Sequence, residues 1–317
     1  MPAVREGAKG AVISGWGTAL PEKVLTNDEL AATMDTSDEW IRARTGIESR
    51  HVGGTTIGLS VESGRQALEM SGLDPARIDG LILATTTPDK QWGNAAAVQN
   101  ELGLRCGAFD VNAACSGFVY GLVTAHGLIA TGADRVMVIG TDSLSRITDW
   151  SDRATAPLFG DGSGAVVLES VDGAGQLLGW DLDADGSALP LLQADVGGFI
   201  RMEGKEVFRR AVRIMVDSAE KSMAHAGVTK DDIKLVVPHQ ANIRIIQAAC
   251  DRLGVPIERA AVVIQRTGNT SSASIPLALA AALDGGRVEQ GDLVLLVGFG
   301  GGMTAASCVL RWGGEAQ

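Results

Sequence analysis

The chain has 317 residues and a net charge of −11, which comes from 27 basic and 38 acidic side chains. This length predicts two domains or one large duplicated unit, and a hydrophobic content of 45% is enough for a substantial core. The acidic balance argues against nucleic acid as the main partner, because binding phosphates requires a basic surface.

The four cysteines lie far apart in the sequence, without a CxxC pair or the spacing of a disulfide framework. The four histidines form no metal-ligand cluster with them, so we expect no metal ion. Residues 1–10 contain charges but no apolar signal region, and no run approaches the roughly 20 apolar residues that cross a bilayer. The sequence therefore predicts a cytoplasmic protein without a membrane partner.

Strands alternate with helices in the first half of the chain. An apolar run at residues 78–84 predicts a strand, and a helix follows it. Residues 108–114 predict a buried strand that passes directly into an apolar helix from residue 116. Further strands are expected at residues 133–140 and 164–168.

The second half repeats this order at an offset of about 155 residues, as an internal duplication would. Its strands are expected at residues 233–238, 261–269, 291–298 and 306–310, with an apolar helix after the second. In this alignment Asn269 falls opposite Cys115. Residues 181–198 are expected to form a loop.

This alternation predicts α/β architecture with mostly parallel sheets, covered by helices on both faces. Two such units related by a pseudo-twofold axis would share their middle helices. The boundary is placed in a glycine- and aspartate-rich stretch, so that residues 1–172 form the first half and residues 173–317 the second. Because ligands of open α/β sheets bind at the carboxyl ends of strands, Cys115 and Asn269 are expected to meet in one cleft.

Cys115 stands where the strand of residues 108–114 gives way to the apolar helix. Unpaired N–H groups and the helix dipole favour an anion at a helix N-terminus, which lowers the pKa of a thiol and makes it a nucleophile. The alternative is a small buried side chain without chemistry, as most free cysteines are. The segment alone leaves both interpretations open.

Two further polar residues are expected at strand ends in the second half. His239 follows a strand that Pro238 terminates, because proline lacks the N–H that a ladder needs. Asn269 either caps the next helix or takes part in chemistry, and the two roles are compatible. The glycine run of residues 298–303 forms either a tight turn or, beside a nucleophile, a source of N–H groups for an oxyanion.

A cysteine, a histidine and an asparagine together favour acyl transfer through a thioester, and the local signature of papain-like proteases is absent. The motifs around them are Ala-Ala-Cys-Ser-Gly-Phe (113–118), Val-Pro-His-Gln-Ala-Asn (237–242) and Gly-Asn-Thr-Ser (268–271). Further motifs are Thr-Ser-Asp-Glu-Trp-Ile (36–41), Arg-Thr-Gly-Ile (44–47), Phe-Gly-Asp-Gly (159–162) and Phe-Gly-Gly-Gly (299–302). In this order they resemble the active-site motifs of β-ketoacyl-acyl-carrier-protein synthase III, from residue 15 to residue 312.

The resemblance implies the thiolase fold, a duplicated α/β unit in five layers (αβαβα), and a homodimer. It implies that Cys115 takes an acyl group from acyl-CoA, while the backbone N–H groups of Cys115 and Gly301 hold the oxyanion. Malonyl-acyl carrier protein would then lose carbon dioxide while His239 and Asn269 hydrogen-bond its thioester carbonyl, and the carbanion would attack the acyl-Cys115. The implied enzyme is an acyltransferase that starts fatty acid synthesis and binds no permanent cofactor.

The same resemblance assigns residues to coenzyme A. Trp40, Arg44 and Arg153 would hold its adenine end through a stacking face and through charge, and Asn242 and Phe299 are assigned to the same substrate. Without the resemblance, surface ion pairing would be the preferred interpretation of the two arginines.

An acidic carrier protein requires a local basic patch on a chain of net charge −11. Arg209 and Arg213 are four residues apart on a predicted helix and share a face, and Arg244 could join them. Such a patch can steer an acidic partner despite a negative net charge. The alternative is an ordinary solvated face.

The sequence departs from the family pattern near the expected substrate. Trp92 stands where the family usually has a proline, Thr267 replaces an aromatic residue or histidine, and Ala305 replaces a tryptophan. The loop of residues 185–201 is also short. These departures leave the preferred acyl group open.

Two other functions are open at this point. The same scaffold could prime a polyketide or transfer an acyl group to an alcohol or amine. It could also be a non-catalytic partner subunit, although the retained Cys115, His239 and Asn269 speak against that. An ordinary thiolase fits less well, because Cys308 lies deep in the last strand rather than after a glycine-rich turn.

Overall fold

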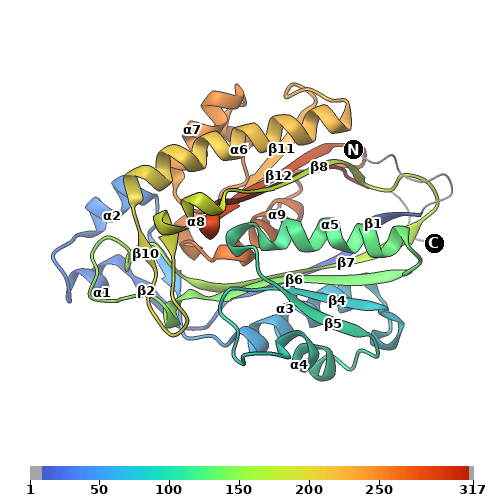
Figure 1. The fold of residues 1–317 in the computed structure, drawn as a ribbon, viewed down its shortest axis with the longest axis horizontal. Helices are drawn as coiled ribbons and strands as arrows, with labels where there is room; N and C mark the ends of the chain where they lie inside the picture. The colour runs from blue at the N-terminus through green and yellow to red at the C-terminus, as the bar shows by residue number, and fades with distance from the viewer. Residues whose placement is uncertain (1–8, 314–317) are drawn as a thin grey trace.

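The computed structural model describes residues 9–313 as five layers, with two sheets face to face and helices between and outside them (Figure 1). The absence of a signal region, predicted for residues 1–10, concerns mostly residues outside this range. No helix among the described residues is both long and apolar enough to span a membrane.

The first sheet belongs to the first half of the chain. In order across the sheet its strands are β1 (Gly10–Ala19), β7 (Asp161–Val171), β6 (Arg135–Ser143), β4 (Gly80–Ala84) and β5 (Gly107–Val111). β4 runs parallel to β5 and β6, while β7 is antiparallel to both β6 and β1.

The second sheet belongs to the second half. Its strands in order are β11 (Ile233–Pro238), β12 (Leu293–Gly300), β13 (Thr304–Arg311) and β8 (Leu177–Ala184). Only β11 and β12 are parallel. The prediction of mostly parallel sheets is therefore wrong: both sheets are mixed, because each half ends in an antiparallel strand and adds an edge strand, β1 or β8, that the sequence analysis missed. The division between residues 172 and 173 falls between β7 and β8 and stays a prediction.

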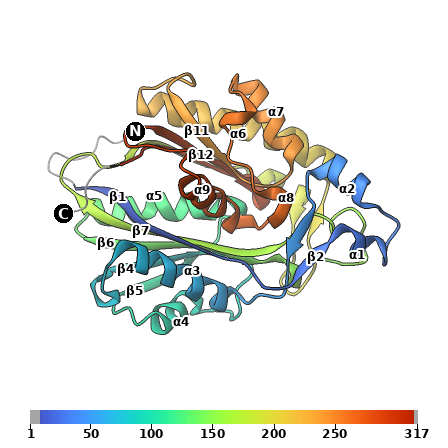
Figure 2. The ribbon, with the colours of Figure 1, turned by 180° about the vertical axis from the view of Figure 1, so that it is seen from behind.

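Two apolar helices fill the space between the sheets. α5 (Gly117–Ala130) and α9 (Ser274–Asp284) pack their buried residues against strands of both sheets in one hydrophobic cluster. Figure 2 shows both helices between the sheets from the opposite side. Small residues permit this close packing, since a side-chain carbon on Gly121 would stand 3.0 Å from Val138. The predicted sharing of middle helices is confirmed.

Amphipathic helices cover the outer faces. α3 (Thr56–Ser71) and α4 (Asn94–Glu101) lie on the first sheet, while α6 (Gly204–Ala226) and α7 (Ile243–Leu253) lie on the second (Figure 2). Short elements flank one end of the layers: β2 (Val24–Thr26), α1 (Asn27–Ala31), α2 (Asp38–Thr45), β3 (Ser49–His51), β9 (Leu192–Gln193), β10 (Arg201–Met202) and α8 (Ile264–Thr267). The loop expected at residues 181–198 thus contains the end of β8 and the strand β9.

The strand expected to be buried at residues 108–114 is an exposed edge strand. β5 ends at Val111, none of its residues is fully buried, and Phe109 is 42% exposed. Among the strands of residues 9–313, its only partner in the sheet is β4. Its apolar residues therefore lie at an open edge of the sheet and not in the hydrophobic core.

The strand expected at residues 261–269 folds instead into a bend and the short helix α8. The buried Gln240 side chain explains the difference. Its Nε2 donates to the Ala261 carbonyl at 3.0 Å, and its Oε1 accepts from the Val263 N–H at 3.0 Å. One side chain thus satisfies backbone groups that a neighbouring strand would otherwise pair with.

Candidate active site

The three side chains singled out in the sequence line one cavity. Cys115, His239 and Asn269 all border a space of about 480 Å³ whose lining comes from both halves of the chain. Two protein halves therefore contribute polar groups to one site, as the duplication predicted. Among residues 9–313, no cluster of three or more histidine, cysteine or carboxylate side chains could hold a metal ion.

The duplication places Cys115 opposite Ser272 and not opposite Asn269. Each half has a 3₁₀ turn directly before its central helix, η2 (Ala114–Ser116) before α5 and η6 (Ser271–Ala273) before α9. The first residue of each turn has left-handed backbone, with φ of 48° and 51°. Cys115 is the second residue of its turn, as Ser272 is of the other. The expected alignment with Asn269 is therefore wrong by three residues.

Burial decides the ionisation state of Cys115. It raises the pKa of the thiol to about 12, although the Ser271 hydroxyl hydrogen-bonds the sulfur and lowers this pKa. Burial therefore acts against the lowering of the pKa that the helix N-terminus is expected to cause. The resting side chain is a neutral thiol, whose proton must leave during any acylation.

The glycine turn after β12 lies against the nucleophile. A side-chain carbon on Gly300 would stand 2.6 Å from the backbone nitrogen of Cys115, so only glycine fits there. The Thr304 hydroxyl donates to the Ala113 carbonyl at 2.8 Å and holds the two segments together. Gly301 lines the cavity beside Cys115. The two residues expected to form an oxyanion site therefore occupy the same end of the cavity.

His239 follows β11 directly, and its backbone N–H donates to the Val297 carbonyl at 2.8 Å. Its ring packs edge to face on Phe299, with the ring centroids 5.4 Å apart. Its Nδ1 lies 2.6 Å from the Ser274 hydroxyl. Burial lowers the pKa of the imidazole to about 3, so the ring is neutral at physiological pH.

Asn269 is oriented by its own segment. Its backbone N–H donates to the Leu158 carbonyl at 2.8 Å, and its side-chain oxygen accepts from the Ser271 N–H at 2.9 Å. The oxygen is thus used for capping, and Nδ2 is the group left for the cavity. Asn112, its counterpart in the first half, also lines the cavity and accepts from the N–H two residues on at 3.3 Å.

A buried carboxylate that the sequence analysis missed joins the halves beside the nucleophile. Asp142, at the end of β6, accepts through Oδ1 from backbone and hydroxyl donors of residues 85–87. Its Oδ2 accepts from the Ser272 N–H at 3.0 Å and hydroxyl at 2.6 Å. Hydrogen bonds to a charged group are worth about 1.5–3 kcal/mol each. Like His239, Asp142 lies near the carboxyl end of a strand, which is the signal that could have identified it.

The rest of the cavity is largely apolar. A cluster of six hydrophobic side chains lines it: Leu144, Ile147, Leu158, Phe159, Leu192 and Ile200. Two of these come from residues 186–202, the segment that carries β9 and β10. A hydrocarbon group would be buried favourably there.

The three single-residue departures from the family pattern do not line the cavity, whereas the short loop of residues 185–201 does. The Thr267 hydroxyl bonds the Val263 carbonyl at 3.2 Å, and Ala305 is buried in β13. Trp92 is 79% exposed on the loop before α4. The apolar cluster, and not these three residues, therefore lines the space beside Cys115.

The residues assigned to coenzyme A form a cluster next to the cavity. The guanidinium carbons of Arg44 and Arg153 lie 5.6 and 4.7 Å from the ring centroid of Trp40. They do not line the cavity itself, but Asn242 does, and its Nδ2 donates to the Arg44 carbonyl at 3.1 Å. Phe299 also lines the cavity.

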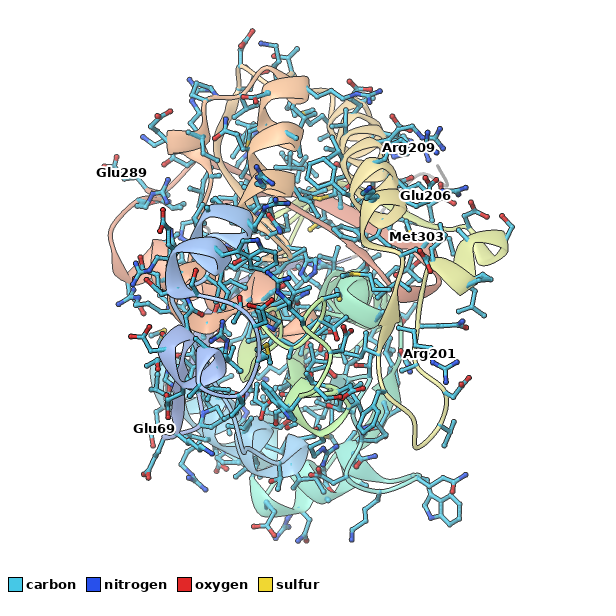
Figure 3. All side chains as sticks on the ribbon, turned by 90° about the vertical axis from the view of Figure 1, so that its left-hand side faces the viewer. Glu69, Arg201, Glu206, Arg209, Glu289 and Met303 are labelled. Atoms are coloured by element: carbon cyan, nitrogen blue, oxygen red, sulfur yellow. The ribbon has the colours of Figure 1, made fainter. Side chains whose placement is uncertain are left out.

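The expected basic patch is partly neutralised within the chain. Figure 3 shows Arg209 beside Glu206 on the outer side of α6, and the two side chains form an ion pair at 2.8 Å. Arg213 lies 4.0 Å from Asp217. Arg244, at the start of α7, forms no ion pair with the described residues, so it is the most available cation of the three.

Sequence and structure comparisons agree with this geometry. Two family models match: 3-Oxoacyl-[acyl-carrier-protein (ACP)] synthase III over residues 109–186, and the C-terminal part of the same family over residues 223–312. The β-ketoacyl-[acyl-carrier-protein] synthase III of Allorhizobium ampelinum is 48% identical over 95% of this chain and 99% of that protein. The enzyme of that name from Sinorhizobium medicae is also 48% identical, over the same shares.

Solved structures give the same result. The 3-oxoacyl-[acyl-carrier-protein] synthase III of Aquifex aeolicus superposes with a TM-score of 0.94 at 44% identity, over 96% of this chain and all of the other. The priming β-ketosynthase of the R1128 polyketide pathway superposes with a TM-score of 0.91 at 36% identity, over 98% and 99% of the two chains. The predicted thiolase-like fold is confirmed. The chain belongs to the β-ketoacyl-acyl-carrier-protein synthase III family, acyltransferases that initiate fatty acid synthesis.

Proposed function

We propose that this chain condenses an acyl group from acyl-CoA with malonyl-acyl carrier protein, using Cys115, His239, Asn269 and Gly301. The observation that carries the proposal is that all four residues line one cavity, next to an apolar cluster suited to an acyl group. The two substrates share this site in succession.

In the first step the sulfur of Cys115 attacks the thioester carbon of acyl-CoA. The backbone N–H groups of Cys115 and Gly301 stabilise the oxyanion that forms. When the intermediate collapses, the bond to the coenzyme A sulfur breaks, and the proton of the thiol ends on coenzyme A. The high pKa of the resting thiol makes this proton transfer part of the acylation step.

In the second step the malonyl group loses carbon dioxide, and its electron pair becomes an enolate on the thioester. His239 Nε2 and Asn269 Nδ2 donate hydrogen bonds to the enolate oxygen. The enolate carbon then attacks the acyl carbon, the Cys115 sulfur leaves as a thiolate and takes a proton from water, and a 3-ketoacyl thioester remains on the carrier. Neutral donors suit this step because the charge they stabilise appears only during reaction.

Trp40, Arg44 and Arg153 are proposed to bind the adenine and phosphates of coenzyme A. Their support is the contact of both guanidinium groups with one aromatic ring beside the cavity. Arg244, assisted by Arg209 and Arg213, is proposed to attract the acidic carrier protein. Asn242 links the coenzyme A cluster to Arg244, because its side chain donates to the Arg44 carbonyl and accepts from the Arg244 N–H.

We also propose that the chain acts as a homodimer in the cytoplasm. The support for a dimer is the open edge of β5 with its exposed Phe109, because an unpaired edge is usually covered in a stable protein. The support for the cytoplasm is that none of the four cysteines forms a disulfide.

The test is a reaction with radiolabelled acetyl-CoA and malonyl-acyl carrier protein. We expect release of carbon dioxide in equal amount to a labelled 3-ketoacyl-acyl carrier protein. Transfer of label to an alcohol or amine without carbon dioxide release would contradict the proposal. A product formed only with the carrier protein of a polyketide pathway would favour the priming role, which the likeness to the R1128 enzyme keeps as the second candidate.

A further inference from the structure

The proposed condensation requires His239 to direct an N–H, and not a lone pair, at the developing enolate. A neutral imidazole has two tautomers, and the hydrogen bond at one ring nitrogen determines which nitrogen carries the proton. We propose that Ser274 is a positioning residue that donates its hydroxyl proton to Nδ1 of His239 and so holds the ring as the Nε2–H tautomer. This inference rests on the proposed function of His239.

A hydrogen-bond count favours this direction of donation. The Ser274 hydroxyl lies 2.6 Å from Nδ1, and both residues are buried, at 0% and 1% exposure. Within residues 9–313 this hydroxyl has no other hydrogen-bond partner. If Nδ1 were the donor, the hydroxyl proton would be buried without an acceptor, which costs its full desolvation. If Ser274 donates, both groups are satisfied.

A third arrangement, in which both ring nitrogens of His239 carry a proton, does not occur at neutral pH. Burial holds the pKa of His239 near 3, so a doubly protonated ring is excluded at neutral pH. Nε2 has no partner in the described chain, and the ring borders the cavity. The proton that Nδ1 does not carry therefore lies on Nε2, on the side left for the substrate.

The duplicated half supplies an internal comparison. Ser274 is the first residue of α9, and Gly117 is the first residue of the equivalent helix α5. His239 follows β11, while Thr85 follows the equivalent strand β4. A hydroxyl at the helix start is thus present in the half with the imidazole and missing in the half without it.

The direct test is the nitrogen chemical shifts of His239 in protein labelled with ¹⁵N-histidine, assigned with a His239→Asn variant. We expect a protonated Nε2 and an unprotonated Nδ1 in the wild type, and a mixture of tautomers in Ser274→Ala. A wild-type ring protonated at Nδ1 would overturn the proposal. This readout needs no substrate, so it is separable from a failure of the proposed reaction.

Kinetics give the second test. Ser274→Ala should acylate at the wild-type rate but condense on the order of 10- to 100-fold more slowly, with little change in KM for malonyl-acyl carrier protein. Ser274→Thr, which keeps the hydroxyl, should recover most of the loss. The matched control is Ser222→Ala, an equally buried serine on α6 whose hydroxyl bonds only a helix carbonyl. Condensation in Ser274→Ala at the rate of this control would overturn the proposal.

Discussion

The two halves of the molecule frame the cavity with the same backbone but with different chemistry. The first half has Cys115 as the second residue of its turn, at the cavity, whereas Ser272, at the equivalent position, is buried and hydrogen-bonded to Asp142. The asparagines that precede the turns, Asn112 and Asn269, both use the side-chain oxygen to cap their own turn. The shared backbone supplies the frame, and single side chains decide which half supplies the nucleophile.

The difference is one of access as well as chemistry. The Ser272 hydroxyl, at the position equivalent to Cys115, donates to Asp142 and is buried, so it is unavailable for acylation. Cys115 is hydrogen-bonded by the Ser271 hydroxyl and not by a carboxylate of the described residues, and it borders the cavity. In a duplicated fold, one of two equivalent positions can therefore carry the reactive side chain while the other holds the two halves together by hydrogen bonds.

Exchanging the nucleophile should produce the largest effect. Cys115→Ala removes the only proposed acyl acceptor, and we expect turnover to fall by about 10⁴-fold or more. Mass spectrometry after incubation with acetyl-CoA should show no acyl adduct. The matched variant is Ser272→Ala, which should lose stability but still acquire one acyl group. An adduct in Cys115→Ala would remove this residue from its role.

The two asparagines should differ in the second step. Asn269→Ala should acylate normally but lose about 10²- to 10³-fold in condensation, the usual effect of removing one oxyanion donor. Asn112→Ala serves as the counterpart and should cost much less, since we assign it no donor role. Rates of carbon dioxide release measure both. Equal losses in the two variants would show that capping, and not donation, is what matters.

The raised pKa of the Cys115 thiol predicts an unusual reactivity profile. The thiolate is the reactive form, so alkylation by iodoacetamide should accelerate about tenfold per pH unit from pH 7 to pH 9. Stopped inactivation assays of residual activity measure this rate. A plateau in this range would mean that the helix N-terminus lowers the pKa after all.

The first half is also proposed to bind coenzyme A. Trp40→Ala should raise KM for acetyl-CoA about tenfold with little change in kcat, because stacking with the adenine and with two arginines is lost. Arg42→Ala is the control on the same helix, since its side chain bonds Asp38 and Glu48 instead. A similar change in both variants would point to disturbance of α2.

The second half is proposed to receive the carrier protein, with the smallest effect. Arg244→Ala should raise KM for malonyl-acyl carrier protein about two- to fivefold and weaken its salt dependence, as expected for a charge at an interface rim. Arg209→Ala should do less, because Glu206 already pairs with Arg209. Steady-state kinetics at low and high salt measure both. An effect on KM for acetyl-CoA alone would contradict this assignment.

Local pattern in the sequence predicted the alternation of strands and helices and three residues of the cavity, whereas the five layers were implied by the family resemblance. Apolar runs identified the central strands and helices, and polar residues at strand ends identified Cys115 and His239. The edge strands β1 and β8 were missed because antiparallel pairing depends on distant partners. The strand expected near residue 264 failed because a distant side chain, Gln240, takes over its backbone hydrogen bonds.

The pKa values and the side-chain orientations of the site residues could not be predicted from the sequence, because they also depend on distant partners. The pKa of Cys115 depends on how much of the thiol is buried, which only tertiary packing determines. Asp142 became a site residue only when the two halves came together, and Ser274 only when α9 packed beside the end of β11. Their partners lie 130 and 35 residues away in the chain.

The most direct test of the account is a pulse and chase followed by peptide mass mapping. Wild-type protein exposed to a mixture of acyl-CoAs should carry one acyl group, located on Cys115, and malonyl-acyl carrier protein should remove it as a 3-ketoacyl product. An acyl group mapped to Cys106, the other partly exposed cysteine, or one that malonyl-acyl carrier protein leaves in place, would contradict it.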